Sequence, residues 1–139
     1  MKQSILLLLV FACFGLPAPC SAADYRNLPL TNALLESGIT VVDIRTEPEW
    51  RETGVVPGSL LLTFFRPDRS YDLEDFVDKL GRHAVSDDEI ALLCRSGNRS
   101  AKLAHLLAEY GYTSIINITG GIRSADGNGV ELVPYVTSP

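Results

Sequence analysis

Cysteine and histidine are scarce in this chain of 139 residues, which has three cysteines and two histidines. Neither His83 nor His105 lies in a cluster of acidic residues and cysteines with metal-ligand spacing, so the sequence predicts no metal site. It also lacks internal repeats, low-complexity tracts and blocks of like charge. A hydrophobic content of 46% at this length suffices for one ordinary core and not for two. We therefore expect one globular domain.

A long apolar run is absent too. The run at residues 5–16 follows Lys2 and is broken by Pro17 and Pro19, and three small residues follow at 21–23. A membrane-spanning helix needs about 20 apolar residues, so an uncleaved anchor is the weaker interpretation. A short apolar run between a positive charge and small residues is typical of a secretory signal peptide.

The sequence thus predicts a signal peptide at residues 1–23 and a periplasmic or secreted domain at residues 24–139, with no stable membrane anchor after cleavage. A lipid-modified Cys20 is disfavoured, because a proline precedes it. Cleavage changes the net charge from −5 to −6, which predicts no nucleic-acid surface. Cleavage also removes Cys13 and Cys20 and leaves Cys94 as the only cysteine, so we expect no internal disulfide.

The residues around Cys94 favour a reactive thiol over the alternative, a buried structural cysteine. The segment 94–100, CRSGNRS, follows a short apolar strand at 90–93 and opens an amphipathic helix. Loop amides and the helix N-terminus would point at the sulfur, and Arg95 and Arg99 would add positive charge, all of which favour thiolate. We expect Cys94 to be a catalytic nucleophile and its loop to bind an anion.

The remaining chain alternates predicted strands and helices. We expect helices at 30–37, from Thr46 to about Arg51, at 73–80 and after Cys94, and strands at 39–44, 60–62, 90–93 and 115–118. Thr46 and Glu49 have the spacing of a capping box, whereas the tail after Gly121 is expected to be irregular. The alternation predicts an α/β domain with a mostly parallel sheet and helices on both faces. Ligands of such sheets bind beyond the carboxyl ends of the strands, where Asp43 and Cys94 should both lie.

Several short motifs carry a family resemblance when taken in order. They are Val41-Val42-Asp43-Ile44-Arg45, Glu49-Trp50, Gly54, Pro57-Gly58-Ser59, the segment 94–100 and Gly120-Gly121. In order and spacing they resemble the single-domain rhodanese family, the thiosulfate sulfurtransferases. The resemblance implies a five-stranded, mainly parallel sheet and an active-site loop from Cys94 to Arg99 that wraps its amides around a cysteine persulfide. It also implies that Asp43 and Arg45 are a structural pair.

Two positions depart from the family pattern. Val55 stands where the family usually has a histidine, and Ala125 stands where a tryptophan is common. Neither position is the nucleophile. The first departure affects hydrogen bonding around the site, and the second suggests that the C-terminal tail packs differently.

The resemblance and the residue types together assign roles to the loop. Cys94 would be the nucleophile, and the substrate-binding residues would be Arg95, Ser96, Gly97, Asn98, Arg99 and Ser100. Gly97 is expected where the backbone turns sharply. Surface charge is the alternative for the two arginines, and helix capping is the alternative for Asn98 and Ser100. No cofactor is required. The partners would be a small anionic sulfur donor and a thiophilic acceptor such as cyanide, a thiol or a thiol-bearing protein.

Three classes of function fit this loop. A sulfurtransferase would carry a sulfane sulfur on Cys94, and a non-catalytic persulfide carrier or redox-sensing module would use the same loop. The third class is a cysteine-dependent phosphatase or arsenate reductase, because related folds cradle a tetrahedral oxyanion with a C-x5-R loop. Here the spacing from Cys94 to Arg99 is C-x4-R, one residue shorter, which fits sulfur better than phosphate.

Overall fold

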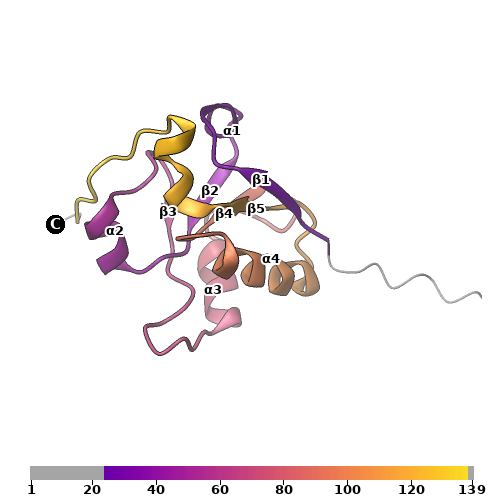
Figure 1. Ribbon diagram of the computed structural model, residues 1–139. Helices are drawn as coiled ribbons and strands as arrows, with labels where there is room; N and C mark the ends of the chain where they lie inside the picture. Colours follow the sequence, from indigo (N-terminus) through magenta and orange to yellow (C-terminus); the bar gives the residue numbers. More distant parts are fainter. Residues whose placement is uncertain (1–23, 138–139) are drawn as a thin grey trace, which may run out of the picture.

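The computed structural model describes residues 24–137, which form one α/β domain around a five-stranded sheet (Figure 1). The strands are β1 (Arg26–Pro29), β2 (Thr40–Asp43), β3 (Leu60–Leu61), β4 (Ile90–Leu93) and β5 (Ile115–Thr119). Their order across the sheet is β1-β5-β4-β2-β3, and every neighbouring pair is parallel. The predicted five-stranded parallel sheet is confirmed.

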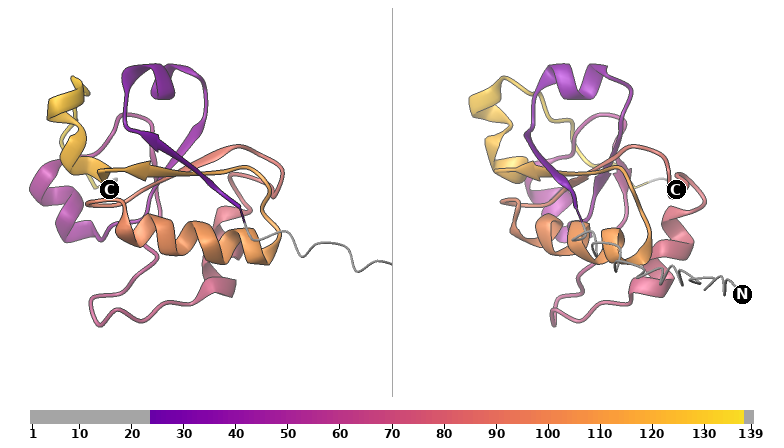
Figure 2. Two further views of the ribbon diagram at one scale, coloured as in Figure 1. Left: turned by 45° about the vertical axis from the view of Figure 1, so that its right-hand side comes forward. Right: turned by 90° about the vertical axis from the view of Figure 1, so that its right-hand side faces the viewer.

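Helices cover both faces of this sheet. They are α1 (Asn32–Glu36), α2 (Glu47–Thr53), α3 (Leu73–Leu80) and α4 (Asn98–Tyr110), followed by two short 3-10 helices, η1 (Gly121–Ser124) and η2 (Asp126–Asn128). Figure 2 shows α3 and α4 on one face, and α1 with the η1–η2 segment on the other. The layers agree with the arrangement predicted from the alternation of elements.

Each face of the sheet has its own hydrophobic cluster. On one face, Phe76 of α3 and Leu103 of α4 pack against β-strand residues such as Leu92. On the other, Ile122 of η1 packs with residues such as Ile116. Strands buried on both faces read as continuous apolar runs, which is why the sequence located β2, β4 and β5 well. Cys94 belongs to the first cluster and is fully buried.

Strand β1 was missed by the sequence analysis. Its four residues, RNLP, have no apolar alternation and are mostly exposed, and Pro29 closes the strand. A proline is tolerated at a sheet edge because no neighbour there requires its missing N–H. The strand is recognisable only from its register with β5, in which Arg26 pairs with Ile116 and Pro29 with Thr119.

The tail after Gly121 is more ordered than the sequence predicted. After η1 and η2 it returns to α2, where Val133 and Val55 exchange two backbone hydrogen bonds of 2.9 Å. Further along, the ring of Tyr135 lies 5.5 Å from the ring of Trp50, whose side chain is buried in the core. The segment therefore packs along α2, and Val55 holds it through its main chain.

The predicted signal peptide lies outside the described residues. Within residues 24–137, no helix has both the length and the apolar character needed to cross a bilayer.

Candidate active site

Cys94 and Asp43 lie at the same edge of the sheet, as predicted. Asp43 ends β2 and pairs with Leu93, the last residue of β4, and the amide of Ile44 donates to the Leu93 carbonyl at 2.9 Å. Because the two strands are parallel neighbours, their carboxyl ends meet there. Asp43, the last residue of β2, and Cys94, the first residue after β4, therefore share one edge of the sheet.

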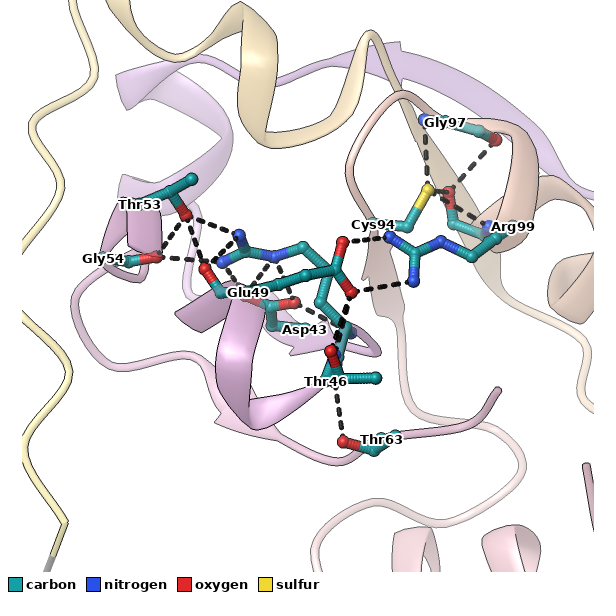
Figure 3. Close-up of polar contacts among 11 residues, drawn as sticks. Asp43, Thr46, Glu49, Thr53, Gly54, Thr63, Cys94, Gly97 and Arg99 are labelled. Carbon is teal, nitrogen blue, oxygen red and sulfur yellow. Dashed lines mark hydrogen bonds and ion pairs between the residues drawn. The ribbon is translucent and has the colours of Figure 1, made fainter. Parts of the chain in front are cut away.

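Three donors surround the sulfur of Cys94 (Figure 3). The amide of Gly97 lies 3.1 Å from Sγ, the amide of Ser100 lies 3.4 Å from it, and the Ser100 hydroxyl lies 3.3 Å from it. Burial raises the pKa of the Cys94 thiol, but the Ser100 hydroxyl and the amides of Ser100, Ser96 and Gly97 lower that pKa more. The net result is a pKa below that of an ordinary thiol, as a nucleophile requires.

A buried polar chain that the sequence analysis did not single out lies behind Ser100. The Ser100 hydroxyl is 2.6 Å from Oδ1 of Asn117 on β5, and Nδ2 of Asn117 donates at 2.8 Å to Oδ1 of Asn27 on β1. A hydroxyl has one proton to donate. Asn117, together with the Gly97 carbonyl 3.1 Å away, therefore competes with the sulfur of Cys94 for the Ser100 proton. The only sequence signal was a polar residue inside an otherwise apolar strand.

Gly97 turns the chain from the loop into α4. Its φ of 94° lies in the left-handed region, and a Cβ there would come within 3.2 Å of the Ile118 carbonyl oxygen. Helix α4 begins immediately after it, and neither Asn98 nor Ser100 caps that helix through its side chain. Capping is therefore not the role of Ser100, whose hydroxyl faces the sulfur.

The start of η1 supports the loop from outside. The amide of Ile122 donates to the Cys94 carbonyl at 2.8 Å, and the amide of Arg123 donates to the Arg95 carbonyl at 3.3 Å. A Cβ on Gly121 would overlap the Cys94 carbonyl oxygen and lie 2.6 Å from the amide nitrogen of Ser96. This close approach explains the second glycine of the Gly120-Gly121 motif.

Arg99 is engaged in a way that the sequence did not predict. Its two terminal nitrogens donate to the Glu49 carboxylate at 2.6 and 2.9 Å, and Glu49 also accepts from the backbone amide of Thr46 in the predicted capping box. Burial raises the pKa of Glu49, but the bonds from Arg99 and Thr46 lower it more, to about 2. Arg99 thus ties the active-site loop to the start of α2 (Figure 3).

Asp43 and Arg45 form the buried pair that the resemblance implied. Arg45 donates to the two carboxylate oxygens of Asp43 at 2.9 and 2.7 Å. Its remaining donors reach the Thr53 hydroxyl at 2.7 Å and the Gly54 carbonyl at 2.9 Å, at the end of α2. A buried charge pair whose other donors are satisfied holds its surroundings in one arrangement. Here it fixes the end of β2 relative to α2 (Figure 3).

The other loop residues predicted to bind substrate are exposed, although the Ser96 amide contributes to the lowered pKa of Cys94. Arg95, Ser96 and Asn98 are exposed, and Arg95 forms no ion pair within residues 24–137. Across the same range, no group of three or more histidine, cysteine or acidic side chains is arranged to hold a metal ion.

The sequence of this chain matches a known protein family. The family model of the rhodanese-like domain matches residues 29–126, which include strands β2 to β5, Cys94 and its loop. The chain belongs to the rhodanese family. This rhodanese is 27% identical over 106 residues to thiosulfate sulfurtransferase 16, chloroplastic, of Arabidopsis thaliana, covering 75% of this chain and 88% of the plant protein.

Two further proteins that are similar to this chain support the assignment to the family. A sulfurtransferase of Allochromatium vinosum is 29% identical over 96 residues, with 68% of this chain and 78% of that protein covered. The crystal structure of a rhodanese-related protein from Thermoplasma volcanium superimposes with a TM-score of 0.58 at 25% identity, covering 80% of this chain and all of the other. The plant protein and the Allochromatium protein are both named for sulfur transfer.

Proposed function

We propose that this rhodanese is a thiosulfate sulfurtransferase that carries a sulfane sulfur as a persulfide on Cys94. The supporting observation is the set of three hydrogen-bond donors around a buried sulfur whose pKa is lowered. Donors that hold a thiolate are equally able to hold the charge of a persulfide. The donor would be a small sulfur anion such as thiosulfate, and the acceptor a thiophile such as cyanide or a thiol.

The first half of the reaction loads the enzyme. The Cys94 thiolate attacks the outer sulfur of thiosulfate, the sulfur–sulfur bond of thiosulfate breaks, and its electron pair leaves with sulfite. The new Cys94 persulfide keeps one negative charge. The amides of Gly97 and Ser100, which bond the thiolate before the reaction, lie at the base of that persulfide.

The second half returns the enzyme to its starting state. An acceptor such as cyanide attacks the outer sulfur of the persulfide, the bond to Cys94 breaks, and thiocyanate leaves. The electron pair of the broken bond stays on Cys94, which is a good leaving group because its pKa is low. No external oxidant or reductant is needed.

The arrangement of Arg99 favours sulfur transfer over phosphatase chemistry. In a C-x5-R loop the arginine serves the tetrahedral oxyanion, whereas both terminal nitrogens of Arg99 are bonded to Glu49. Breaking that ion pair would be required before Arg99 could bind phosphate in a bidentate manner. The shorter spacing between Cys94 and Arg99 points the same way.

Steady-state turnover tests this function. Wild type should produce thiocyanate from thiosulfate and cyanide and should leave an aryl phosphate intact, and Cys94→Ser should produce none. A serine hydroxyl is close in shape to the thiol and cannot form a persulfide, so folding should be retained. Hydrolysis of the aryl phosphate without thiocyanate formation would overturn the proposal in favour of a phosphatase.

We also propose that the enzyme works outside the cytoplasm, after removal of residues 1–23. The basis is the short apolar run at residues 5–16 with Lys2 before it and small residues after it. N-terminal sequencing of the exported protein should find Ala23 or Asp24 first. Met1 or Lys2 at the start of the mature protein would contradict the proposal.

A further inference from the structure

Cations without an ionic partner gather around the active-site loop. Away from the loop, arginine and lysine side chains are paired: Arg26 with Glu89, Arg51 with Glu47, Lys79 with Asp75 and Arg82 with Asp78. Those that form no ion pair within residues 24–137 are Arg66, Arg69, Arg95, Lys102 and Arg123. All five line one of two cavities that also contain loop residues. In a chain of net charge −5, this distribution points to an anionic ligand.

The two cavities differ in charge and size. The one beside α2 contains Arg95 and Arg123 but also Glu49 and Glu52, and its volume is about 100 Å³. The other, which we call the basic cavity, has a volume of about 670 Å³ and is lined by Arg66, Arg69, Arg99, Lys102, Ser96 and Asn98, together with apolar side chains. No acidic side chain lines it. No negatively charged side chain in the lining of the basic cavity therefore offsets its positive charge.

The chain between β3 and α3 presents two of these cations from a tight turn. The amide of Arg66 donates to the Ser70 carbonyl, and the amide of Arg69 donates to the Arg66 carbonyl, both at 2.9 Å. Arg69 has a φ of 67°, which a non-glycine residue adopts only at some cost. Asp68, between the two arginines, accepts bonds from the amide and hydroxyl of Ser70. Both arginines are exposed, and both line the basic cavity.

Lys102, the cation that α4 contributes to the basic cavity, lies against two aromatic rings. Its ammonium lies 5.5 Å from the ring centre of Phe65 and 4.9 Å from that of Tyr71. Cation–π contacts of this kind fix the charge beside the rings. Helix α4, which begins at the active-site loop, is thereby joined to the turn that carries Arg66 and Arg69.

The basic cavity is larger than a ligand of the size of thiosulfate requires. Cavities of roughly 300 to 1,000 Å³ accommodate drug-sized ligands, whereas thiosulfate would occupy only a small part of this one. Several fixed cations around an open volume match a ligand with more than one negative group, each spaced from the next.

We propose that the basic cavity binds the sulfur acceptor, and that this acceptor is a low-molecular-weight thiol with at least two carboxylates. The inference rests on the proposed sulfur transfer. The acceptor thiol attacks the outer sulfur of the Cys94 persulfide, and a new sulfur–sulfur bond forms as the bond to Cys94 breaks. The acceptor leaves as its own persulfide, and its thiol proton replaces the lost sulfur on Cys94.

Two acceptors and two sets of variants test this assignment. Mercaptosuccinate carries two carboxylates and mercaptoethanol carries none, so the ratio of their kcat/KM values measures recognition of charge. In the variant Arg66→Gln, Arg69→Gln, Lys102→Gln this ratio should fall about tenfold or more at low salt. The matched control is Arg26→Gln, Lys79→Gln, Arg82→Gln, which removes the same residue types and the same charge elsewhere. Its ratio should stay within about twofold of wild type.

The failures are distinguishable. Formation of thiocyanate from thiosulfate and cyanide reports the proposed function separately; if wild type forms none, that function fails and this inference with it. If thiocyanate forms but wild type does not favour mercaptosuccinate, or both triple variants lower the ratio equally, only the acceptor site is wrong. Slower persulfide loading from thiosulfate in the cavity variant, with an unchanged acceptor ratio, would assign the cavity to the donor and overturn the proposal. Single variants Arg66→Gln and Arg69→Gln give the same readout if the triple variant does not fold.

Discussion

Arg99 and Glu49, 50 positions apart in the chain, form a two-pronged ion pair that joins the active-site loop to helix α2. The carboxylate is also part of the capping box that starts α2. Bonding to Glu49 raises the pKa of Arg99, and the charge of Cys94 raises it further, so Arg99 still contributes to the electrostatics of the sulfur. The principal contact of Arg99 is nevertheless the ion pair with Glu49, which holds the loop against α2.

Glu49→Gln should destabilise the fold, and the loss should depend on pH. Glutamine keeps the capping box, so the variant removes mainly the ion pair. The pKa of Glu49 is about 2 instead of 4.5, which corresponds to about 1 to 3 kcal/mol after allowing for solvent around the pair. Because folding lowers this pKa, the contribution is complete above pH 4.5 and is lost as pH falls toward 2. Urea unfolding of both proteins across this range measures it.

Glu47→Gln is the matched control. Glu47 lies in the same first turn of α2 and pairs with Arg51, but both side chains are about half exposed. An exposed pair of this kind contributes about 0.5 kcal/mol or less. Equal losses for the two variants, or a Glu49→Gln loss that does not change with pH, would contradict the role given to the Arg99 pair.

Ser100 and Asn117 should shift the pKa of Cys94 in opposite directions. Ser100→Ala removes a hydroxyl donor to the sulfur, so the pKa of Cys94 should rise. Asn117→Val removes the nearer of the two acceptors that compete with the sulfur for the Ser100 proton, the other being the Gly97 carbonyl, so that pKa should fall. Titration of thiolate absorbance against pH measures both, with Cys94→Ser as the blank. Shifts in the same direction would mean that Asn117 does not act through the Ser100 hydroxyl.

Gly121→Ala should damage the loop, whereas Gly127→Ala should be tolerated. A Cβ on Gly121 would overlap backbone atoms of the active-site loop, and its φ of 58° adds strain, so we expect a loss of about 2 to 4 kcal/mol. A Cβ on Gly127 meets no atom within 4 Å. Thermal unfolding compares the two variants. A Gly121→Ala protein as stable as Gly127→Ala would contradict the close packing of η1 against the loop.

Much of the fold was predictable from local patterns. The buried strands β2 and β4 are continuous apolar runs, and the capping residues of α2 mark its start in the sequence. The position of Cys94 after β4 followed directly. Strand β1 was not predictable, because an exposed edge strand containing proline has no hydrophobic period and depends on pairing with β5.

The partners of the site residues were harder to foresee than the residues themselves. The sequence identified Cys94, Ser100 and Arg99, but contacts between positions far apart set the roles of the last two. Ser100 meets Asn117 from β5, and Arg99 meets Glu49 from α2. Such side-chain pairs depend on how the elements pack and leave no spacing signal along the chain.

The most direct test of the account is the intact mass of the protein after treatment with thiosulfate. Wild type should gain the mass of one sulfur atom and lose it when cyanide is added, with thiocyanate formed in equal amount. Cys94→Ser should gain nothing under the same conditions. An unchanged wild-type mass, or a sulfur gain that persists in Cys94→Ser, would contradict a Cys94 persulfide as the intermediate.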